Sequence, residues 1–228
     1  MYKLHFINGR SLIIDLHLNG KTIVVIGAGN EALKRIKLLQ SEECSIIVIG
    51  EKPHSEIIKL SKQKKIQLKK SKITSTQFLK KFKPFLVIAS TSDSSLNQKI
   101  INDAKKLKIL AYASDSPDSS DVSYLSIIDL KNTIKIGIST SGSSPIMAKK
   151  IKSKTEKFLQ KNISKNDLDL IKIQKFARNE SRKSISSQTE RKKFLYAIMN
   201  DKRVKELLKD GKYKRIQTVI TKMVKDWE

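Results

Sequence analysis

The chain has 228 residues, of which 39% are hydrophobic and 6% aromatic. This composition is typical of a globular protein and allows one large domain or two small ones. The opening residues lack the order of a secretory signal, and no apolar run reaches the ~20 residues that a membrane span requires. Composition therefore argues against a secreted or membrane-spanning protein.

The net charge is +25, with +14 in residues 146–228 and +11 in residues 1–145. A Lys-dominated excess that is spread over the whole chain is weaker evidence for nucleic-acid binding than a clustered basic stripe. Such an excess also suits a polyanionic small substrate, whose carboxylates a basic cleft would attract.

Metal and disulfide chemistry is poorly supported. The single Cys44 cannot form an intramolecular disulfide, which fits a reducing cytoplasm, and we expect it to be a small core residue. The three histidines are His5, His17 and His54, and their scattered positions predict no bound metal.

Residues 1–113 alternate between apolar strands and amphipathic helices. Strands are predicted at 12–17, 23–26, 45–49, 66–68, 85–89 and 109–113. Helices are predicted at 31–39, 55–63, 76–82 and 96–107. Because strands and helices alternate, the fold class is α/β, with an N-terminal Rossmann-type, doubly wound parallel sheet.

The pattern changes after Asp115. A turn-rich stretch is followed by strands predicted at 124–129 and 133–139, and residues 130–132 suit a hairpin between them. Strands outside the parallel sheet have edges to cover, which favours pairing across a dimer. We therefore expect residues 114–150 to form a small α+β dimerisation and active-site region.

Residues 151–228 are expected to form an all-helical C-terminal domain. A helix should begin near Ile146, after a Pro145 that suits the first helical position, and roughly four or five helices in all should fill the chain from there to its end. The Ser-rich segment 181–190 is interpreted as a loop or a helix-capping region. The side chains expected to face inward are Phe158, Leu168, Ile171, Phe176, Phe194, Ile198, Leu207, Leu208, Ile216, Ile220 and Trp227.

A glycine-rich turn follows the strand at 23–26. Residues 27–32, GAGNEA, fit the G-x-G-x-x-[GA] pattern between a strand and a helix, in which Gly27 allows the tight turn and Gly29 admits a pyrophosphate. The N–H groups and the dipole of the following helix favour phosphate charge. Glu51, at the end of the next strand, is spaced to bind a ribose. The turn predicts a dinucleotide site; the alternative is a tight turn that binds no nucleotide.

Polar residues also end the later strands. Ser90 and Thr91 lie where doubly wound sheets bind ligands, although the segment 89–93 also suits a plain loop with an Asp or Ser helix cap. Asp115 ends the next strand, where a carboxylate could act as a base, orient a substrate, hold a metal or simply form a turn before Ser-Pro. The loop from Thr140 to Ser144 precedes a helix and could hold an anion on its N–H groups.

These residues together resemble a known family. The matching segments are VIGAGNEALKRIKLL (25–39), VIASTSDSSLNQKI (87–100), ASDSP (113–117), SIIDL (126–130) and ISTSGSSPIMAKKIK (138–152). In order and spacing the chain resembles the precorrin-2 dehydrogenase/sirohydrochlorin ferrochelatase family, the dehydrogenase–chelatase module of siroheme synthase. The helical tail is similar in length and type but hardly in sequence.

The resemblance implies NAD-dependent oxidation of precorrin-2 to sirohydrochlorin, and then insertion of ferrous iron, a transient substrate, to give siroheme. It implies a cytoplasmic homodimer with no nucleic-acid or membrane partner. It also implies a set of site residues: Gly27, Gly29, Asn30, Glu31, Glu51, Lys52, Ser90 and Thr91 for NAD, Asp115 for dehydrogenation and chelation, and Thr140, Ser141, Gly142 and Ser143 for the tetrapyrrole.

The chain departs from the family pattern in a few places. A G-A-G replaces the usual G-G-G, Tyr112 replaces an Asn often found before the aspartate, and the methyltransferase domain of the longer fusion is not expected. Because some members oxidise without chelating, a dehydrogenase alone is an alternative. A Rossmann-type regulator that senses NAD or binds nucleic acid is another.

Overall fold

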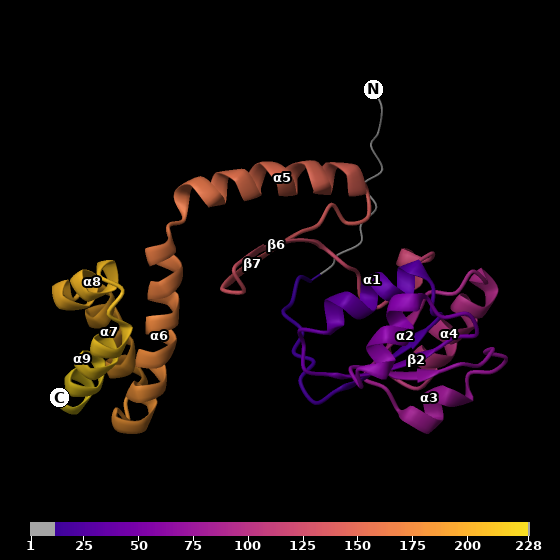
Figure 1. Cartoon of the computed structure of the whole chain (residues 1–228), viewed down its shortest axis with the longest axis horizontal. Helices are drawn as coiled ribbons and strands as arrows, with labels where there is room; N and C mark the ends of the chain where they lie inside the picture. Colours follow the sequence, from indigo (N-terminus) through magenta and orange to yellow (C-terminus); the bar gives the residue numbers. More distant parts are fainter. Residues whose placement is uncertain (1–11, 228) are drawn as a thin grey trace. The chain divides into compact units, whose positions relative to one another are not determined.

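The computed structural model describes residues 12–227, and the chain divides into two compact units (Figure 1). The first unit ends at Tyr124 and the second begins at Leu125. The region expected at 114–150 is thus shared between the two units.

The first unit is built on a five-stranded sheet in the order β3-β2-β1-β4-β5. All neighbouring strands are parallel, and the central Val24 pairs with Ile47 on one side and Val87 on the other. This order reverses between β1 and β4, as in Rossmann-type sheets, and confirms the predicted fold class. The strands are β1 (Thr22–Ile26), β2 (Ser45–Ile49), β3 (Gln67–Lys69), β4 (Leu86–Ala89) and β5 (Leu110–Ala113).

Helices cover both faces of this sheet. Ile23 and Val25 belong to the core that packs under α1 and α2, whereas Val24 and Ile26 belong to the core under α3 and α4. Because successive strand residues point to opposite faces, a strand buried on both sides must be apolar throughout. The helices are α1 (Asn30–Leu39), α2 (Ser55–Lys62), α3 (Gln77–Phe82) and α4 (Ser94–Lys106).

The strand predicted at 12–17 is wrong. These residues are extended but belong to no strand, and Leu12, Ile13 and Ile14 are 84%, 58% and 61% exposed. Their β propensity has no neighbouring strand to pair with, since β1 is bordered on both sides by β2 and β4. Local β propensity is therefore insufficient here without a neighbouring strand to pair with.

The second unit begins with an antiparallel hairpin of β6 (Ser126–Leu130) and β7 (Ile134–Ile138). Lys131 and Asn132 turn the chain with φ of 53° and 54°, and the Thr133 N–H donates to the Leu130 carbonyl at 3.0 Å. The predicted hairpin and its connection are confirmed. In the described residues this sheet has two strands only, so both of its outer edges lack a strand.

Five helices follow within the described residues, in agreement with the prediction. Helix α5 contacts the hairpin, while α6 to α9 share a core of their own. Within the described part of the chain, no helix is long and apolar enough to cross a membrane. The helices are α5 (Pro145–Asn162), α6 (Lys165–Ser184), α7 (Gln188–Asn200), α8 (Lys202–Lys209) and α9 (Tyr213–Lys225).

The prediction of inward-facing residues is wrong at two positions. Phe158 is 65% exposed because it lies on α5, which adds nothing to the core of α6 to α9, and Ile171 is 42% exposed beside the inward stripe of α6. The other nine are buried or packed against a core. The Ser-rich segment 181–190 forms the end of α6, a short link and the start of α7, which the Ser187 hydroxyl caps.

Candidate active site

The glycine-rich turn leaves the end of β1 at the carboxyl edge of the sheet. Gly27 has φ of 100°, and its N–H donates to the Ile49 carbonyl at 2.9 Å. A Cβ at Gly27 would lie 2.5 Å from the Ser90 carbonyl oxygen, closer than side chains approach. Both the positive φ and the contact with the end of β4 therefore require glycine here.

Gly29 has a different role in the same turn. It is the N-cap of α1, where no side chain forms a capping hydrogen bond, and a Cβ built there meets nothing within 4 Å. The first N–H groups of α1 thus face an open position that a Cβ would partly fill. An open position of this kind fits a pyrophosphate, which would meet both the N–H groups and the positive end of the helix dipole.

Asn30 and Glu31 begin α1 beside this position. Asn30 is exposed, while the Glu31 carboxylate pairs with Lys34 at 2.5 Å and lies 3.8 Å from Arg35. The hydrogen bond from Lys34 holds the pKa of Glu31 below its usual value. Glu31 therefore remains ionised at neutral pH and is engaged within its own helix.

The loop after β2 is tied to the glycine-rich turn. The His54 N–H donates to the Ala28 carbonyl at 2.8 Å, and a Cβ at Gly50 would lie 2.7 Å from the Ala28 Cβ. This close approach brings the exposed Glu51 and Lys52 beside the turn, as the sequence predicted. Sequence reasoning did not single out Gly50, whose lack of a side chain permits this approach; its place between a buried strand and an acidic residue was the available signal.

The end of β4 supplies Ser90 and Thr91. Both the N–H and the hydroxyl of the nearly buried Ser90 donate to the Ile26 carbonyl, at 2.8 and 3.1 Å. Asp93 caps α4 by accepting from the Leu96 N–H at 3.0 Å. Within segment 89–93, Asp93 thus forms the predicted helix cap, while Ser90 and Thr91 lie at the end of the strand.

Asp115 lies just beyond β5 and is joined to the end of β4 through Asn97. The Asn97 Nδ2 donates to the Asp115 Oδ2 at 3.1 Å and to the Thr91 carbonyl at 3.1 Å. Asp115 is exposed, and its carboxylate does not cap the short helix at Pro117–Ser119. The structure therefore brings Asp115 and Thr91 together through a residue that sequence reasoning missed.

The Asp115 carboxylate is charged under ordinary conditions. Partial burial raises its pKa, but hydrogen bonds from the Ser94 and Asn97 side chains outweigh that effect and hold the pKa below its usual value. The group is thus an acceptor at neutral pH. It can orient a polar substrate, and it can take a proton from a stronger acid.

A cluster of rings lies on the α1 face of β5. The Tyr112 hydroxyl accepts from Arg35 Nη2 at 2.7 Å, and the Arg35 guanidinium lies 4.2 Å from the centre of the Tyr124 ring. Burial raises the pKa of Tyr112, and it raises that of Tyr124 to about 12. Tyr112, the departure from the family pattern, is therefore used to anchor α1 to the edge of the sheet.

The loop predicted to contact the tetrapyrrole belongs to the second unit. The Ser143 N–H donates to the Thr140 carbonyl at 2.9 Å, and the Ser144 N–H donates to the Thr140 hydroxyl at 3.1 Å. The Ser141 N–H donates to the Ser139 hydroxyl at 3.0 Å. Because these N–H groups are engaged within the loop, anion binding here would depend on the Gly142 N–H and the hydroxyl groups.

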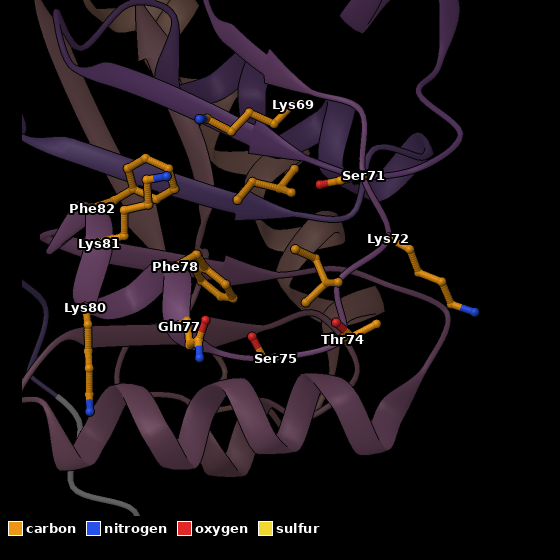
Figure 2. Close-up of a pocket in the computed structure, with 12 residues that line it drawn as sticks. Lys69, Ser71, Lys72, Thr74, Ser75, Gln77, Phe78, Lys80, Lys81 and Phe82 are labelled. Carbon is orange, nitrogen blue, oxygen red and sulfur yellow. The ribbon is translucent and has the colours of Figure 1, made fainter.

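A surface cavity of about 590 Å³ opens near the carboxyl ends of β2 and β3 (Figure 2). Its lining contains none of the predicted cofactor residues. The lining residue nearest to them in sequence is Ile49, which precedes Gly50 and Glu51. The cavity has no acidic residue in its lining, whose large side chains include Phe78, Phe82, Lys69, Lys72, Lys80 and Lys81. The predicted cofactor residues thus lie along the open strand edge, outside this cavity.

The chemistry of the site residues suits a dinucleotide. Among residues 12–227 no three His, Cys, Asp or Glu side chains are grouped so that they could hold a metal ion. Along the edge, in the strand order β2-β1-β4, the acidic Glu51, the open position at Gly29 and the small residues at the end of β4 fit a ribose, a pyrophosphate and a flat ring.

Comparison with known proteins identifies the first unit. A family model described as "Putative NAD(P)-binding" matches residues 14–126. A solved structure titled "SirC, precorrin-2 dehydrogenase" superposes with a TM-score of 0.68 over 95% of this chain and 100% of that chain, at 20% identity. The chain is therefore a Rossmann-type NAD(P)-binding protein, with the expected helical C-terminal region.

Curated relatives show a more specific similarity, which extends beyond the first unit. Siroheme synthase of Buchnera aphidicola is 28% identical over 208 residues, covering 91% of this chain and 42% of the relative. Siroheme synthase of Actinobacillus succinogenes is 26% identical over 193 residues, covering 85% of this chain and 39% of the relative. These similarities confirm the resemblance to the precorrin-2 dehydrogenase/chelatase module of siroheme synthase. The chain spans about two fifths of the length of these two relatives.

Proposed function

We propose that this chain is an NAD-dependent precorrin-2 dehydrogenase that also inserts ferrous iron into the product. The observation that carries the proposal is the link from the dinucleotide turn to Asp115. Gly27 lies against the end of β4 at Ser90, and the adjacent Thr91 is joined through Asn97 to the Asp115 carboxylate. An anionic acceptor thus lies at the sheet edge that would hold the nicotinamide.

The reaction needs a hydride acceptor and a proton acceptor. Oxidation of precorrin-2 to sirohydrochlorin removes one hydride and one proton, and NAD supplies the hydride acceptor when bound. Asp115 is the proposed proton acceptor, because no described His lies near it in sequence and its carboxylate is ionised. Thr140, Ser141, Gly142 and Ser143 are proposed to contact the carboxylates of the tetrapyrrole.

We propose NAD over NADP because Glu51 is exposed beside the glycine-rich turn. A carboxylate there accepts hydrogen bonds from ribose hydroxyls and repels a 2′-phosphate. The rest of the proposed cofactor site consists of Gly27, Gly29, Asn30, Lys52, Ser90 and Thr91, with Glu31 at the start of α1.

Iron insertion and dimerisation complete the proposal. Asp115 would guide ferrous iron, a substrate, to the pyrrole nitrogens as their protons leave. The proposed homodimer is supported by the hairpin, whose outer edges lack strands within the described residues, and by α5, on which Ile146 is 79% exposed. The proposed location is the cytoplasm, which the single Cys44 fits.

The test is an anaerobic incubation of the purified chain with precorrin-2 and NAD. We expect the absorption spectrum to change to that of sirohydrochlorin with one equivalent of NADH formed. Ferrous or cobalt ion added afterwards should be inserted faster than in a protein-free control. Oxidation without accelerated insertion would leave a dehydrogenase alone, and the absence of oxidation would refute the proposal.

A further inference from the structure

Asn97 is fully buried, yet it lies on an otherwise apolar stripe of α4. Its Oδ1 accepts from the Thr91 N–H at 3.2 Å and from the Thr91 hydroxyl at 2.8 Å. Its Nδ2 donates to the Thr91 carbonyl and to the Asp115 Oδ2, both at 3.1 Å. A carboxamide offers two acceptor positions and two donor hydrogens, so all four are used.

The orientation of this amide is fixed by its partners. A backbone N–H can only donate, so the Asn97 oxygen must face the Thr91 N–H. The NH₂ group must then face the Thr91 carbonyl and the Asp115 carboxylate, both of which are acceptors. The donor half of Asn97 is thus directed at the Asp115 carboxylate, just beyond the end of β5.

We propose that Asn97 is a positioning residue that fixes the Asp115 carboxylate relative to Thr91 at the junction of the two strand ends. The role that Asp115 then plays in oxidation rests on the proposed function. Through this bond the orientation of Asp115 is coupled to the end of β4, where the nicotinamide is proposed to lie.

A simpler interpretation is that Asn97 acts on Thr91 alone. Three of the four hydrogen bonds of Asn97 go to that residue, and they would stabilise the turn before α4 whether or not Asp115 had a function. The bond to Asp115 distinguishes the two roles. A donor directed at a carboxylate favours its ionised form, whereas turn stabilisation leaves the titration of Asp115 unchanged.

Asn97→Asp is the sharpest variant because it preserves the shape and both acceptor positions toward Thr91. It replaces the donor half with an oxygen that faces the Asp115 carboxylate. Two facing carboxyl groups titrate as a pair, so the acid limb of the oxidation rate should move up by at least about one pH unit. At neutral pH we expect kcat to fall by about 100-fold, with the dissociation constant of NAD within about twofold of the parent value.

The Ser94→Ala variant is the matched control, since Ser94 is exposed and its hydroxyl also bonds Asp115. It should shift the acid limb in the same direction but by less, with unchanged thermal stability. An unchanged acid limb in a folded Asn97→Asp protein would overturn the proposal.

A measurement on the unsubstituted Asn97 keeps the test decisive if Asn97→Asp does not fold. The side-chain NH₂ resonances of Asn97 should titrate with the Asp115 carboxyl in NMR spectra of the full chain, and Asp115→Ala should abolish that titration. Resonances that do not respond to Asp115→Ala would refute the positioning role. Because this measurement needs no substrate, it decides the inference even if the chain fails to oxidise precorrin-2.

Discussion

The two units of the chain differ in how far they are complete by themselves. In the first unit each strand end is bonded to its neighbour, through contacts such as His54 to Ala28 and Asn97 to Asp115. In the second unit α6 to α9 close a core, but α5 leaves Ile146 and Phe158 exposed beside a two-stranded hairpin. The first unit thus presents a preformed polar edge, and the second presents apolar surface that a partner would cover.

This difference explains why the two units carry different kinds of information in their sequences. The polar edge depends on positions that only one residue type can occupy without strain, such as Gly27 at positive φ. The helical core requires only apolar residues at helical spacing, which many sequences satisfy. In agreement with this difference, the helical tail hardly resembles the family in sequence, whereas the superposition on the SirC structure covers 95% of the chain.

The largest effect should come from Gly27→Ala. The new Cβ would meet the Ser90 carbonyl at 2.5 Å with φ at 100°, so we expect the unfolding free energy of the first unit to fall by about 2–3 kcal/mol or more. Binding of NAD should be lost. Denaturant unfolding and calorimetric titration measure the two effects.

Gly29→Ala is its matched control in the same turn. Because no atom lies within 4 Å of the new Cβ, stability should stay within about 0.5 kcal/mol of the parent value. The dissociation constant of NAD should nevertheless rise about tenfold, since the methyl group occupies the position proposed for the pyrophosphate. Unchanged NAD affinity in Gly29→Ala would place the cofactor elsewhere.

Asp115→Ala should abolish oxidation while leaving NAD affinity nearly intact. The carboxylate is the proposed proton acceptor, and its loss should cost about 10²- to 10⁴-fold in rate. Its partners Asn97 and Ser94 are on α4, apart from the glycine-rich turn, so pyrophosphate binding should be spared. Metal insertion should fall as well. Oxidation at the parent rate would remove Asp115 from the mechanism, and lost NAD binding would indicate a disturbed fold near Pro117.

The sequence predicted the sheet, its helices and the positions of Gly27, Glu51 and Thr91, because each follows a periodic strand or a fixed spacing. Asn97 was missed because a single Asn on a helix carries no pattern, and its value depends on two partners that only the fold brings together. The strand at 12–17 failed for the opposite reason. Its local propensity is real, but the sheet has no edge free beside β1.

The exposed face of the second unit provides the next test. If residues 114–150 form most of a homodimer interface, Ile146→Glu should convert the dimer to a monomer at micromolar concentration, because a charge would be buried there. Leu38→Glu is the control, since Leu38 is 53% exposed on α1 of the first unit. Light scattering that finds a monomeric parent protein would contradict the prediction.

A smaller effect is expected on cofactor choice. At equal concentrations the chain should oxidise precorrin-2 faster with NAD than with NADP, and Glu51→Gln should reduce that preference about tenfold. The neighbouring Lys52 attracts a 2′-phosphate, so Lys52→Gln should increase the preference. A parent protein that prefers NADP would exclude Glu51 as the discriminating residue.

The smallest effect should come from Tyr213→Phe at the start of α9. The Tyr213 hydroxyl donates to the Asp169 carboxylate at 2.6 Å, and this bond, with burial opposing it and Lys172 assisting, holds the pKa of Asp169 below its usual value. A depressed carboxyl pKa contributes stability above its unfolded value of about 3.9, and that stability is lost as the pH falls through the folded value. The variant should therefore melt a few degrees lower at neutral pH, and the difference should vanish in acid. A difference that persists below that range would assign the effect of Tyr213 to packing, because protonated Asp169 no longer attracts the hydroxyl.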